Sequence, residues 1–320
     1  MTGVDGVVRI STPLGGRRND VYAFVGSART VLFDTGVAGV ATDFILPGLA
    51  AARVRPEQVS HVVVSHCDVD HFGGITDARQ HFRQAAFLAH PKDAGMMQDF
   101  GLYLQGRGRS FYANYGLDEP PLDLSWAREV TGEGPIDVLV TGGEWIDLGD
   151  RGVQVLHVPG HSRGHLAISD PGRGLVAISD AVLGSAVPDA DGNPLFPPTY
   201  RHVADYLRTI ALVRSLAPSR LVTAHYGQFE GAAVVDFLDE SEAFCRTVGI
   251  AVDTLFTTDH EAGRTLSDCV DELLPTLGTW PNEGRRNALA FPVCGHLEEL
   301  VRVGRLTLDA TVRPAVFRRS

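Results

Sequence analysis

The chain has 320 residues, of which 44% are hydrophobic and 21% are charged, and this composition excludes disordered, coiled-coil and collagen-like proteins. Its 28 basic and 39 acidic residues give a net charge of −11, so it lacks the basic surface typical of nucleic-acid binders, and we expect no nucleic-acid partner. The length allows one large domain or two modest ones. The chain has twelve histidines, and where they lie along the sequence is the main question.

The cysteines and the apolar segments predict the cellular compartment. The four cysteines form no CxxC pair, which disfavours a zinc ribbon and a disulfide framework. The N-terminal segment has no basic stretch followed by an apolar run, and no apolar stretch approaches the ~20 residues that span a bilayer. We therefore predict a cytoplasmic enzyme without a membrane anchor, and we leave a homodimer open.

Short β-branched runs separated by turn residues predict strands at 7–10, 21–25 and 30–33. A helix over 42–52, an apolar strand at 62–64, a helix over 74–82 and a strand at 86–89 follow. Further strands are expected at 153–158, 166–168, 175–178 and 221–223. Because short strands alternate with helices, the pattern predicts a layered α/β fold.

Two stretches, 95–135 and 185–200, interrupt this pattern and read as long irregular segments, either binding loops or surface insertions. After about residue 236 we expect no strands but three helices, over 231–248, 265–277 and 285–303, followed by a polar and apolar alternation. We therefore predict two domains, 1–235 and 236–320, the second small and helical.

One run carries most of the chemical information. The sequence SHCDVDH at 65–71 places His66, Asp68, Asp70 and His71 directly after an apolar strand. Imidazole and carboxylate groups are the ligands that hold zinc, manganese or iron in proteins. A polar turn has no need of histidine at both ends of a carboxylate pair, so this run indicates a metal site.

Three later strand ends add one candidate ligand each, and these are His161, Asp180 and His225. A single histidine at the end of a strand is more often structural than functional. All three follow directly after the end of a predicted strand, where a loop can direct side chains beyond the edge of the sheet. Taken together they indicate that the metal site draws on both halves of the chain.

This ordered set resembles the metallo-β-lactamase superfamily of metallohydrolases, whose pattern is His-x-His-x-Asp-His, then a lone His, a bridging Asp and a last His. The resemblance covers about residues 5–230 and implies an α/β fold, a four-layer αββα sandwich. It implies a first metal ion on His66, Asp68 and His161, a second on Asp70, His71 and His225, and a bridge from Asp180. It also implies that Asp34 supports the ligand loop, whereas His165 falls outside the ligand spacing.

Asp68 departs from the family pattern, which has a histidine there. Three carboxylates against two divalent ions leave little positive charge to acidify a bridging water. Oxygen ligands also shift preference from zinc towards iron or manganese, and the flavodiiron oxygen reductases resemble this chain in having a carboxylate here. We expect two divalent ions, zinc first, with iron or manganese as the alternatives that Asp68 raises. A purely structural Asp68, with the first ion absent, is the other interpretation.

The resemblance implies a hydrolase in which a bridging hydroxide attacks an acyl bond, with Asp70 as the catalytic residue that orients the water or moves its proton. The Pro-Gly-His-x-x-Gly-His stretch at 159–165 resembles glyoxalase II and lactonase members, so a lactone, thioester or similar ester is expected. The aromatic residues of 95–135 suit an apolar acyl chain or ring as the small-molecule substrate.

The C-terminal segment from Asn287 to Leu306 resembles the winged-helix tail of a subgroup of these hydrolases, some of which act on RNA. We interpret it as a packing and pocket-closing module, because acidic residues balance its arginines. Three alternatives stay open at this stage: a diiron oxygen-dependent redox enzyme, a phosphodiesterase or RNase-type member, and a ligand sensor without turnover.

Overall fold

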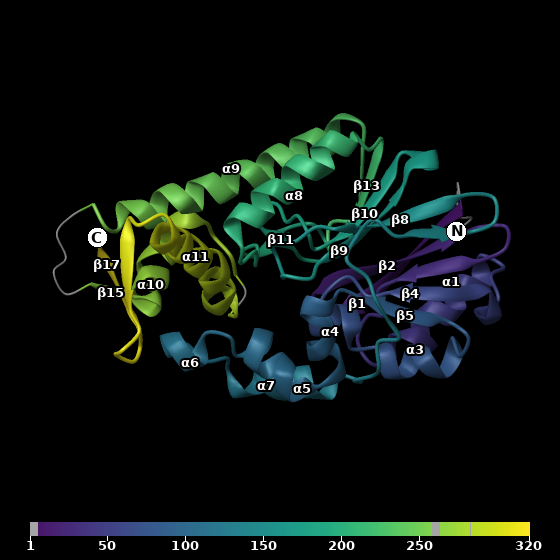
Figure 1. Ribbon diagram of the computed structural model, residues 1–320, viewed down its shortest axis with the longest axis horizontal. Helices are drawn as coiled ribbons and strands as arrows, with labels where there is room; N and C mark the ends of the chain where they lie inside the picture. The colour runs from purple at the N-terminus through teal and green to yellow at the C-terminus, as the bar shows by residue number, and fades with distance from the viewer. Residues whose placement is uncertain (1–5, 258–262, 282) are drawn as a thin grey trace.

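Two six-stranded sheets form the body of the protein in the computed structural model, which describes residues 6–257, 263–281 and 283–320 (Figure 1). The first sheet keeps chain order, antiparallel from β1 to β3 and parallel from β3 to β6. Its strands are β1 (Val7–Leu14), β2 (Arg17–Val25), β3 (Thr30–Phe33), β4 (Val59–Val63), β5 (Ala86–Ala89) and β6 (Val138–Leu139).

The second sheet has the order β14-β13-β10-β9-β8-β7, in which β10 and β13 are parallel and the other neighbours antiparallel. Its strands are β7 (Trp145–Asp147), β8 (Gly152–His157), β9 (Leu166–Asp170), β10 (Leu175–Ser179), β13 (Arg220–Thr223) and β14 (Gln228–Glu230). Main-chain hydrogen bonds from Leu166 to Ser65 and from Asp20 to Ala224, each 2.8 Å, join the two sheets near the ends of β4 and β13.

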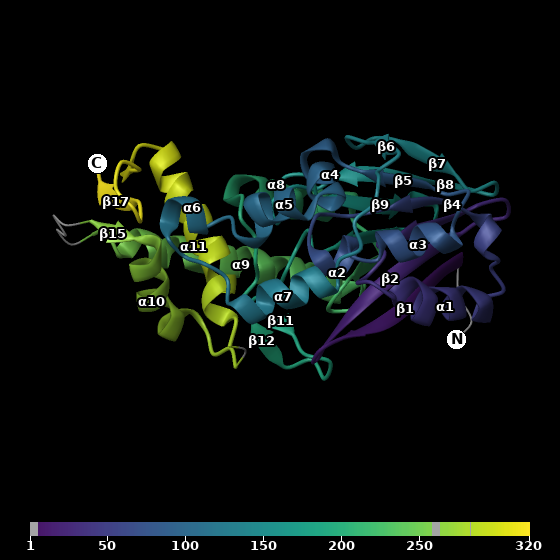
Figure 2. The ribbon, with the colours of Figure 1, turned by 90° about the horizontal axis from the view of Figure 1, so that it is seen from below.

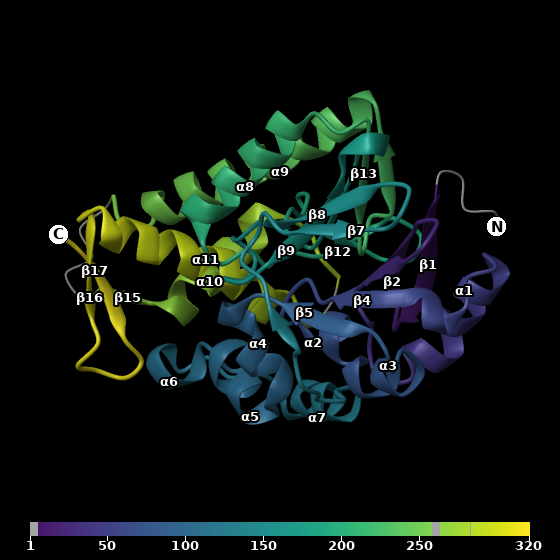
Figure 3. The same ribbon diagram turned by 45° about the vertical axis from the view of Figure 1, so that its right-hand side comes forward.

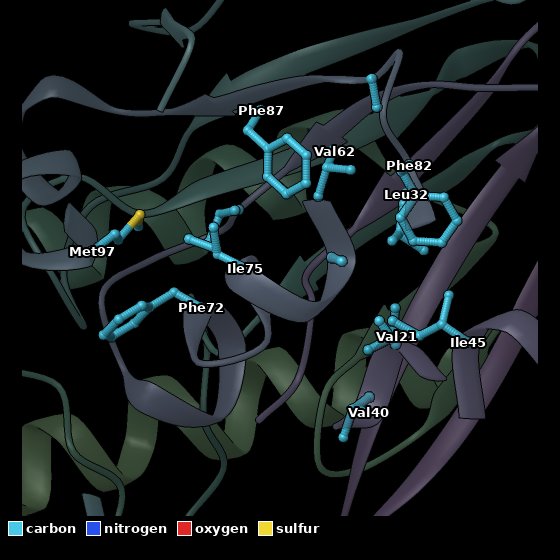
Figure 4. Close-up of a cluster of buried hydrophobic side chains, with 14 of the residues drawn as sticks. Val21, Leu32, Val40, Ile45, Val62, Phe72, Ile75, Phe82, Phe87 and Met97 are labelled. Carbon is cyan, nitrogen blue, oxygen red and sulfur yellow. The ribbon is translucent and has the colours of Figure 1, made fainter. Parts of the chain in front are cut away.

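The layering follows from the alternation of side chains along each strand. In β2, Val21 and Ala23 face an outer core that the first sheet shares with its helices, whereas Tyr22 and Phe24 face a central core between the sheets. The strands are apolar on both faces because both faces are covered. Figure 4 shows part of the outer core, where Phe72, Ile75 and Phe87 pack beneath the sheet.

Helices cover the outer face of each sheet, which gives the four layers αββα (Figure 3). The helices and helical turns on the first sheet are η2 (Ala41–Ile45), α1 (Leu46–Ala51), η3 (Pro56–Gln58), α2 (Val69–Phe72), α3 (Ile75–His81) and α4 (Pro91–Gln98). The second sheet is covered by α8 (Val203–Leu216) and the first half of α9 (Ala232–Thr254), with η5 (Pro171–Arg173) between β9 and β10.

The expectation of long irregular segments was wrong in part. Most of 95–135 consists of short helices, because prolines, aspartates and glycines begin and end a turn every few residues. These elements are α5 (Phe100–Tyr103), the π-helical turn η4 (Leu104–Gly108), α6 (Tyr112–Tyr115) and α7 (Pro121–Glu129). The helices α5, α6 and α7 lie along the lower edge of the molecule in Figure 1 and are seen from below in Figure 2. The segment 185–200 contains a small hairpin, β11 (Val187–Pro188) with β12 (Pro194–Phe196).

The C-terminal part contains α10 (Leu266–Leu277), α11 (Arg285–Arg302) and a three-stranded sheet of β15 (Arg264–Thr265), β16 (Leu306–Asp309) and β17 (Val316–Arg319). The expectation that strands cease after residue 236 was therefore wrong: the polar and apolar alternation that follows the predicted helix 285–303 contains β16 and runs into β17, a short antiparallel pair. The predicted boundary at 235 falls in the first turn of α9, whose Phe237 packs on the second sheet and whose Val248 packs in the C-terminal core. The two-domain division stays a prediction. Among the described residues, no helix is long and apolar enough to cross a membrane.

Candidate metal centre

The candidate ligands converge because they follow strands whose ends meet at one edge of the sandwich. His66 and the short helix α2 follow β4, which is parallel to β3. Asp180 follows β10 and His225 follows β13, which are also a parallel pair. His161 lies in the turn between β8 and β9. Since parallel neighbours end at the same edge, side chains far apart in sequence come together there.

The residues proposed for a first ion lie at mutual distances suited to a shared cation. The Asp68 Oδ2 atom is 3.0 Å from His161 Nε2 and 3.6 Å from His66 Nε2. All three side chains can offer one ligand atom within 4.8 Å of the others. Ligand atoms about 2.0–2.2 Å from a common ion are separated by distances of this size.

The residues proposed for a second ion form a similar group. Asp180 Oδ2 lies 3.2 Å from His225 Nε2 and 3.5 Å from His71 Nε2, and Asp70 Oδ2 lies 3.6 Å from His225 Nε2. Ligand atoms of His66, His71 and Asp180 also lie within 4.8 Å of one another, which places Asp180 between the two sets. The structure thus brings all seven predicted residues together.

Buried atoms without hydrogen-bond partners test whether these residues suit a metal. The Nε2 atoms of His66 and His71 and the Oδ1 atom of Asp180 are buried and have no hydrogen-bond partner in the described part of the chain. A buried polar atom without a hydrogen-bond partner destabilises the folded state unless a water molecule or an ion binds it. Burial acts to lower the pKa of His71, but the neighbouring carboxylates of Asp70, Asp180 and Asp34 raise it well above its usual range. The carboxylates around His71 therefore favour positive charge at this position, and the candidate ligands suit divalent ions.

Asp34 holds the ligand loop through a buried network of hydrogen bonds. It accepts from the Ser65 main-chain N–H at 2.7 Å and from the Ser65 and Ser179 hydroxyls at 2.9 Å. Its Oδ2 atom is also 2.9 Å from His71 Nδ1, which keeps the proton on Nδ1 and directs Nε2 towards the candidate site. Ser179 was not anticipated from the sequence. Both Asp34 and Ser179 have positive φ, 71° and 49°, which points to a constrained backbone behind the site.

His165 and Cys67 lie behind the candidate ligands. The His165 ring stacks on His66 at 4.3 Å between centroids, and its Nε2 atom faces the Ile178 carbonyl at 3.2 Å. Cys67 is buried, and burial raises the pKa of its thiol well above the usual range, so it stays protonated. Asp93, also missed from the sequence, accepts from Ser162 Oγ at 2.5 Å and from the Gly164 N–H at 2.8 Å. These contacts fix the loop that carries His161.

Arg107 is the residue of the site that sequence reasoning missed most clearly. Its Nε donates to Asp68 Oδ1 at 2.5 Å and its Nη2 donates to Asp68 Oδ2 at 2.7 Å. Burial acts to raise the pKa of Asp68, but Arg107 and His161 outweigh it and hold this pKa well below its usual range. Arginine supplies all but one of the basic side chains, so no signal in the sequence distinguishes this arginine from the others.

A pocket of about 470 Å³ opens over the candidate ligands, with Asp68, Asp70, Asp180 and His225 in its wall. Its apolar wall includes side chains from well-separated parts of the chain, among them Leu124 and Trp126 of α7, Phe196 of β12, and Phe291 of α11. A water molecule or an acyl group could thus lie between an acidic, metal-binding floor and aromatic side chains. This combination is typical of sites for small apolar substrates.

Comparison with known proteins identifies the family. The family model described as the metallo-beta-lactamase superfamily matches residues 14–225, and the chain belongs to that superfamily. The resemblance and the αββα fold class expected from the sequence are confirmed, and the chain is a metal-dependent hydrolase.

Two curated relatives carry the name acyl-coenzyme A thioesterase MBLAC2. The chicken protein (Gallus gallus) is 27% identical over 227 residues, which cover 67% of this chain and 74% of that protein. The human protein is 26% identical over 230 residues, covering 67% and 75%. Among solved structures, the metallo-beta-lactamase family protein TTHA1429 of Thermus thermophilus covers 99% of both chains with a TM-score of 0.74 at 19% identity. At that identity the likeness concerns the fold alone, and it extends through the C-terminal part.

Proposed function

We propose that this chain hydrolyses an acyl thioester or a related acyl ester such as a lactone, using two divalent ions held by the seven convergent residues. The observation that carries the proposal is the pocket that joins these residues to an apolar wall. The relatives named acyl-coenzyme A thioesterase favour a thioester over a lactone. Zinc is the first expectation for the metal, with iron or manganese as alternatives because of Asp68.

The ligand assignment proposed is His66, Asp68 and His161 for one ion and Asp70, His71 and His225 for the other, with Asp180 between them. When bound, ions at such a site supply Lewis acidity that activates water and polarises an acyl carbonyl. The protein residues orient that chemistry. Asp70 borders the pocket, and its carboxylate is placed to accept a proton from a water molecule on the pocket floor.

The aromatic residues of the pocket would bind the acyl chain. Trp126 is 41% exposed although it borders the pocket, so it has apolar surface to bury against a ligand. Phe291 comes from α11, so the C-terminal part completes the wall. Burial of apolar surface contributes about 25 cal/mol per Å², and each methylene that reaches these rings adds to affinity until the pocket is full.

The experiment is a panel of acyl thioesters of increasing chain length, with lactones alongside, assayed on protein supplied separately with zinc, manganese and iron. We expect thioester hydrolysis that Asp180→Ala abolishes. We expect Trp126→Ala to raise KM for long acyl chains more than for short ones, with Trp145→Ala as the matched control because Trp145 is exposed on β7 and lies outside the pocket wall.

Metal-loaded protein that hydrolyses none of these acyl compounds would overturn the proposal. Oxygen consumption with a supplied electron donor would favour the diiron redox alternative instead. Cleavage of a phosphodiester, with no acyl hydrolysis, would favour the phosphodiesterase alternative.

A further inference from the structure

The two halves of the candidate metal centre differ in charge, and the difference comes from Arg107. The first group has one carboxylate, Asp68, and both of its oxygens accept hydrogen bonds from the Arg107 guanidinium. The second group has Asp70, with Asp180 between the two groups, and in the described part of the chain neither carboxylate is paired with an arginine or lysine; both lie against His71 and His225 instead. A bound cation therefore meets a carboxylate neutralised by arginine at the first group and one that no arginine neutralises at the second.

Arg107 also lies against the nitrogen atom that a metal ion would need from His161. Its Nη2 atom lies 3.0 Å from His161 Nε2. The same Nε2 atom is 3.0 Å from Asp68 Oδ2, so in the neutral ring it either accepts from the guanidinium, with its proton on Nδ1, or donates to the carboxylate. In both tautomers Nε2 is engaged by Arg107 or by Asp68, and a metal ion that binds Nε2 has to displace that contact.

The positions of these atoms place any metal ion shared by Asp68 and His161 close to the guanidinium. Nη2 lies 2.7 Å from Asp68 Oδ2 and 3.0 Å from His161 Nε2, and those two atoms are 3.0 Å apart. An ion at bonding distance from both atoms would lie within about 4 Å of Nη2, whichever side of them it occupied. Two cations that close in a buried site repel each other strongly. The first ion can bind fully only after the guanidinium has moved.

The C-terminal part of the chain holds Arg107 in this position. Its guanidinium carbon lies 4.3 Å from the centre of the Phe291 ring on α11, a cation–π contact, and Nη1 donates to the His161 carbonyl at 3.2 Å. The side chain is 8% exposed, and its Cα lies in the π-helical turn η4, a type of turn often found at functional sites. Arg107 is therefore fixed from three sides rather than resting on the surface.

We propose that Arg107 is a built-in competitor for the first metal ion, so that the Asp70 group binds one ion tightly and the Asp68 group binds a second ion much more weakly. The inference rests on the metal centre of the proposed function, and it adds that occupancy is unequal and that Phe291 of the C-terminal part controls it. The Asp68 substitution and Arg107 act together, since Arg107 pairs with the carboxylate that replaces the family's histidine.

The test is a zinc titration of the full chain by calorimetry, with elemental analysis of the bound metal, on wild type and Arg107→Met. Methionine keeps an apolar side chain against Phe291 and removes the charge. We expect wild type to bind one equivalent tightly and the second at least tenfold more weakly, and Arg107→Met to tighten the second by at least tenfold. Arg109→Met removes the same charge two residues away, from a surface pair with Asp118, and should leave both affinities unchanged.

Further variants keep the inference falsifiable. Phe291→Leu should tighten the second equivalent by a smaller factor, and Arg107→Lys should fall between wild type and Arg107→Met. Two equally tight ions in wild type, or a second affinity that stays the same or weakens in Arg107→Met, would overturn the inference and leave the metal centre standing. No tight zinc binding by wild type would overturn both. Thermal melting of each metal-free variant reports whether it folds.

Discussion

Asp34→Asn is the substitution that examines the support of the metal centre most directly. Asparagine has nearly the same shape as aspartate and tolerates the positive φ of 71° at this position, so the backbone is preserved. The side-chain oxygen can still accept from the Ser65 N–H, but the amide NH₂ replaces the oxygen that faces His71 Nδ1 at 2.9 Å. Two donors then face each other at a fully buried position.

The magnitude follows from that one lost acceptor. The Ser65 and Ser179 hydroxyls can rotate, and Ser179 Oγ, 3.1 Å from His71 Nδ1, can accept from the His71 N–H in place of Asp34, so we expect a cost at the lower end of the about 1–3 kcal/mol of an unsatisfied buried donor. Alternatively His71 shifts its proton to Nε2 and can no longer bind a metal there. Loss of such supporting contacts lowers metal affinity by about 10–100-fold.

Two measurements check this prediction: the free energy of unfolding of the metal-free protein in denaturant, and the zinc affinity. Asp137→Asn is the matched control, because Asp137 also accepts a main-chain N–H, from Phe87 at 2.8 Å, and pairs with Arg79 away from the metal centre. We expect it to leave zinc affinity unchanged. Zinc affinity of Asp34→Asn within about threefold of wild type would refute the view that Asp34 sets the orientation of His71.

Three further predictions concern metal retention and pH. Asp180→Ala should abolish tight metal binding measured by elemental analysis, whereas His165→Ala should keep the metal and lose about 2–4 kcal/mol of stability through the cavity it leaves; equal metal loss would contradict the ligand assignment. Removal of metal with a chelator should lower the melting temperature of wild type but barely change that of Asp180→Ala, because a bound ion stabilises only the folded state. Burial lowers the pKa of His296 to about 4, so the unfolded chain binds the proton more readily, and the contribution of this residue to stability is full above about pH 6.5 and falls by up to about 3 kcal/mol towards pH 4. Burial also lowers the pKa of His90 and His202 to about 4, so His296→Gln should make the fall of the unfolding free energy shallower without removing it.

Much of the fold could be predicted because the strands are strongly apolar and bounded by turn residues. Val62 and Val63 belong to β4 as expected, the predicted strands at 30–33 and 86–89 coincide with β3 and β5, and the predicted strand at 21–25 is the second half of β2. The prediction failed where elements are short. The two-residue strand β15 is too short to show any alternation, the alternation over β16 and β17 was seen but not interpreted as strands because it follows three helices, and the short helices of 95–135 lack an apolar stripe.

The order of residues along the chain was enough to predict which side chains could form the metal centre. Apolar runs show where the strands end, and histidine and aspartate at several successive strand ends are rare outside such sites. The order of residues was also enough to show that Asp68 changes the usual ligand set. What Asp68 contacts, however, depends on how the chain packs in three dimensions. Arg107 lies 39 positions from it along the chain, on a turn whose place depends on packing against Phe291. A hydrogen bond between such distant residues leaves no periodic trace in the sequence, so the partner that governs the first metal site becomes visible only once the chain is folded.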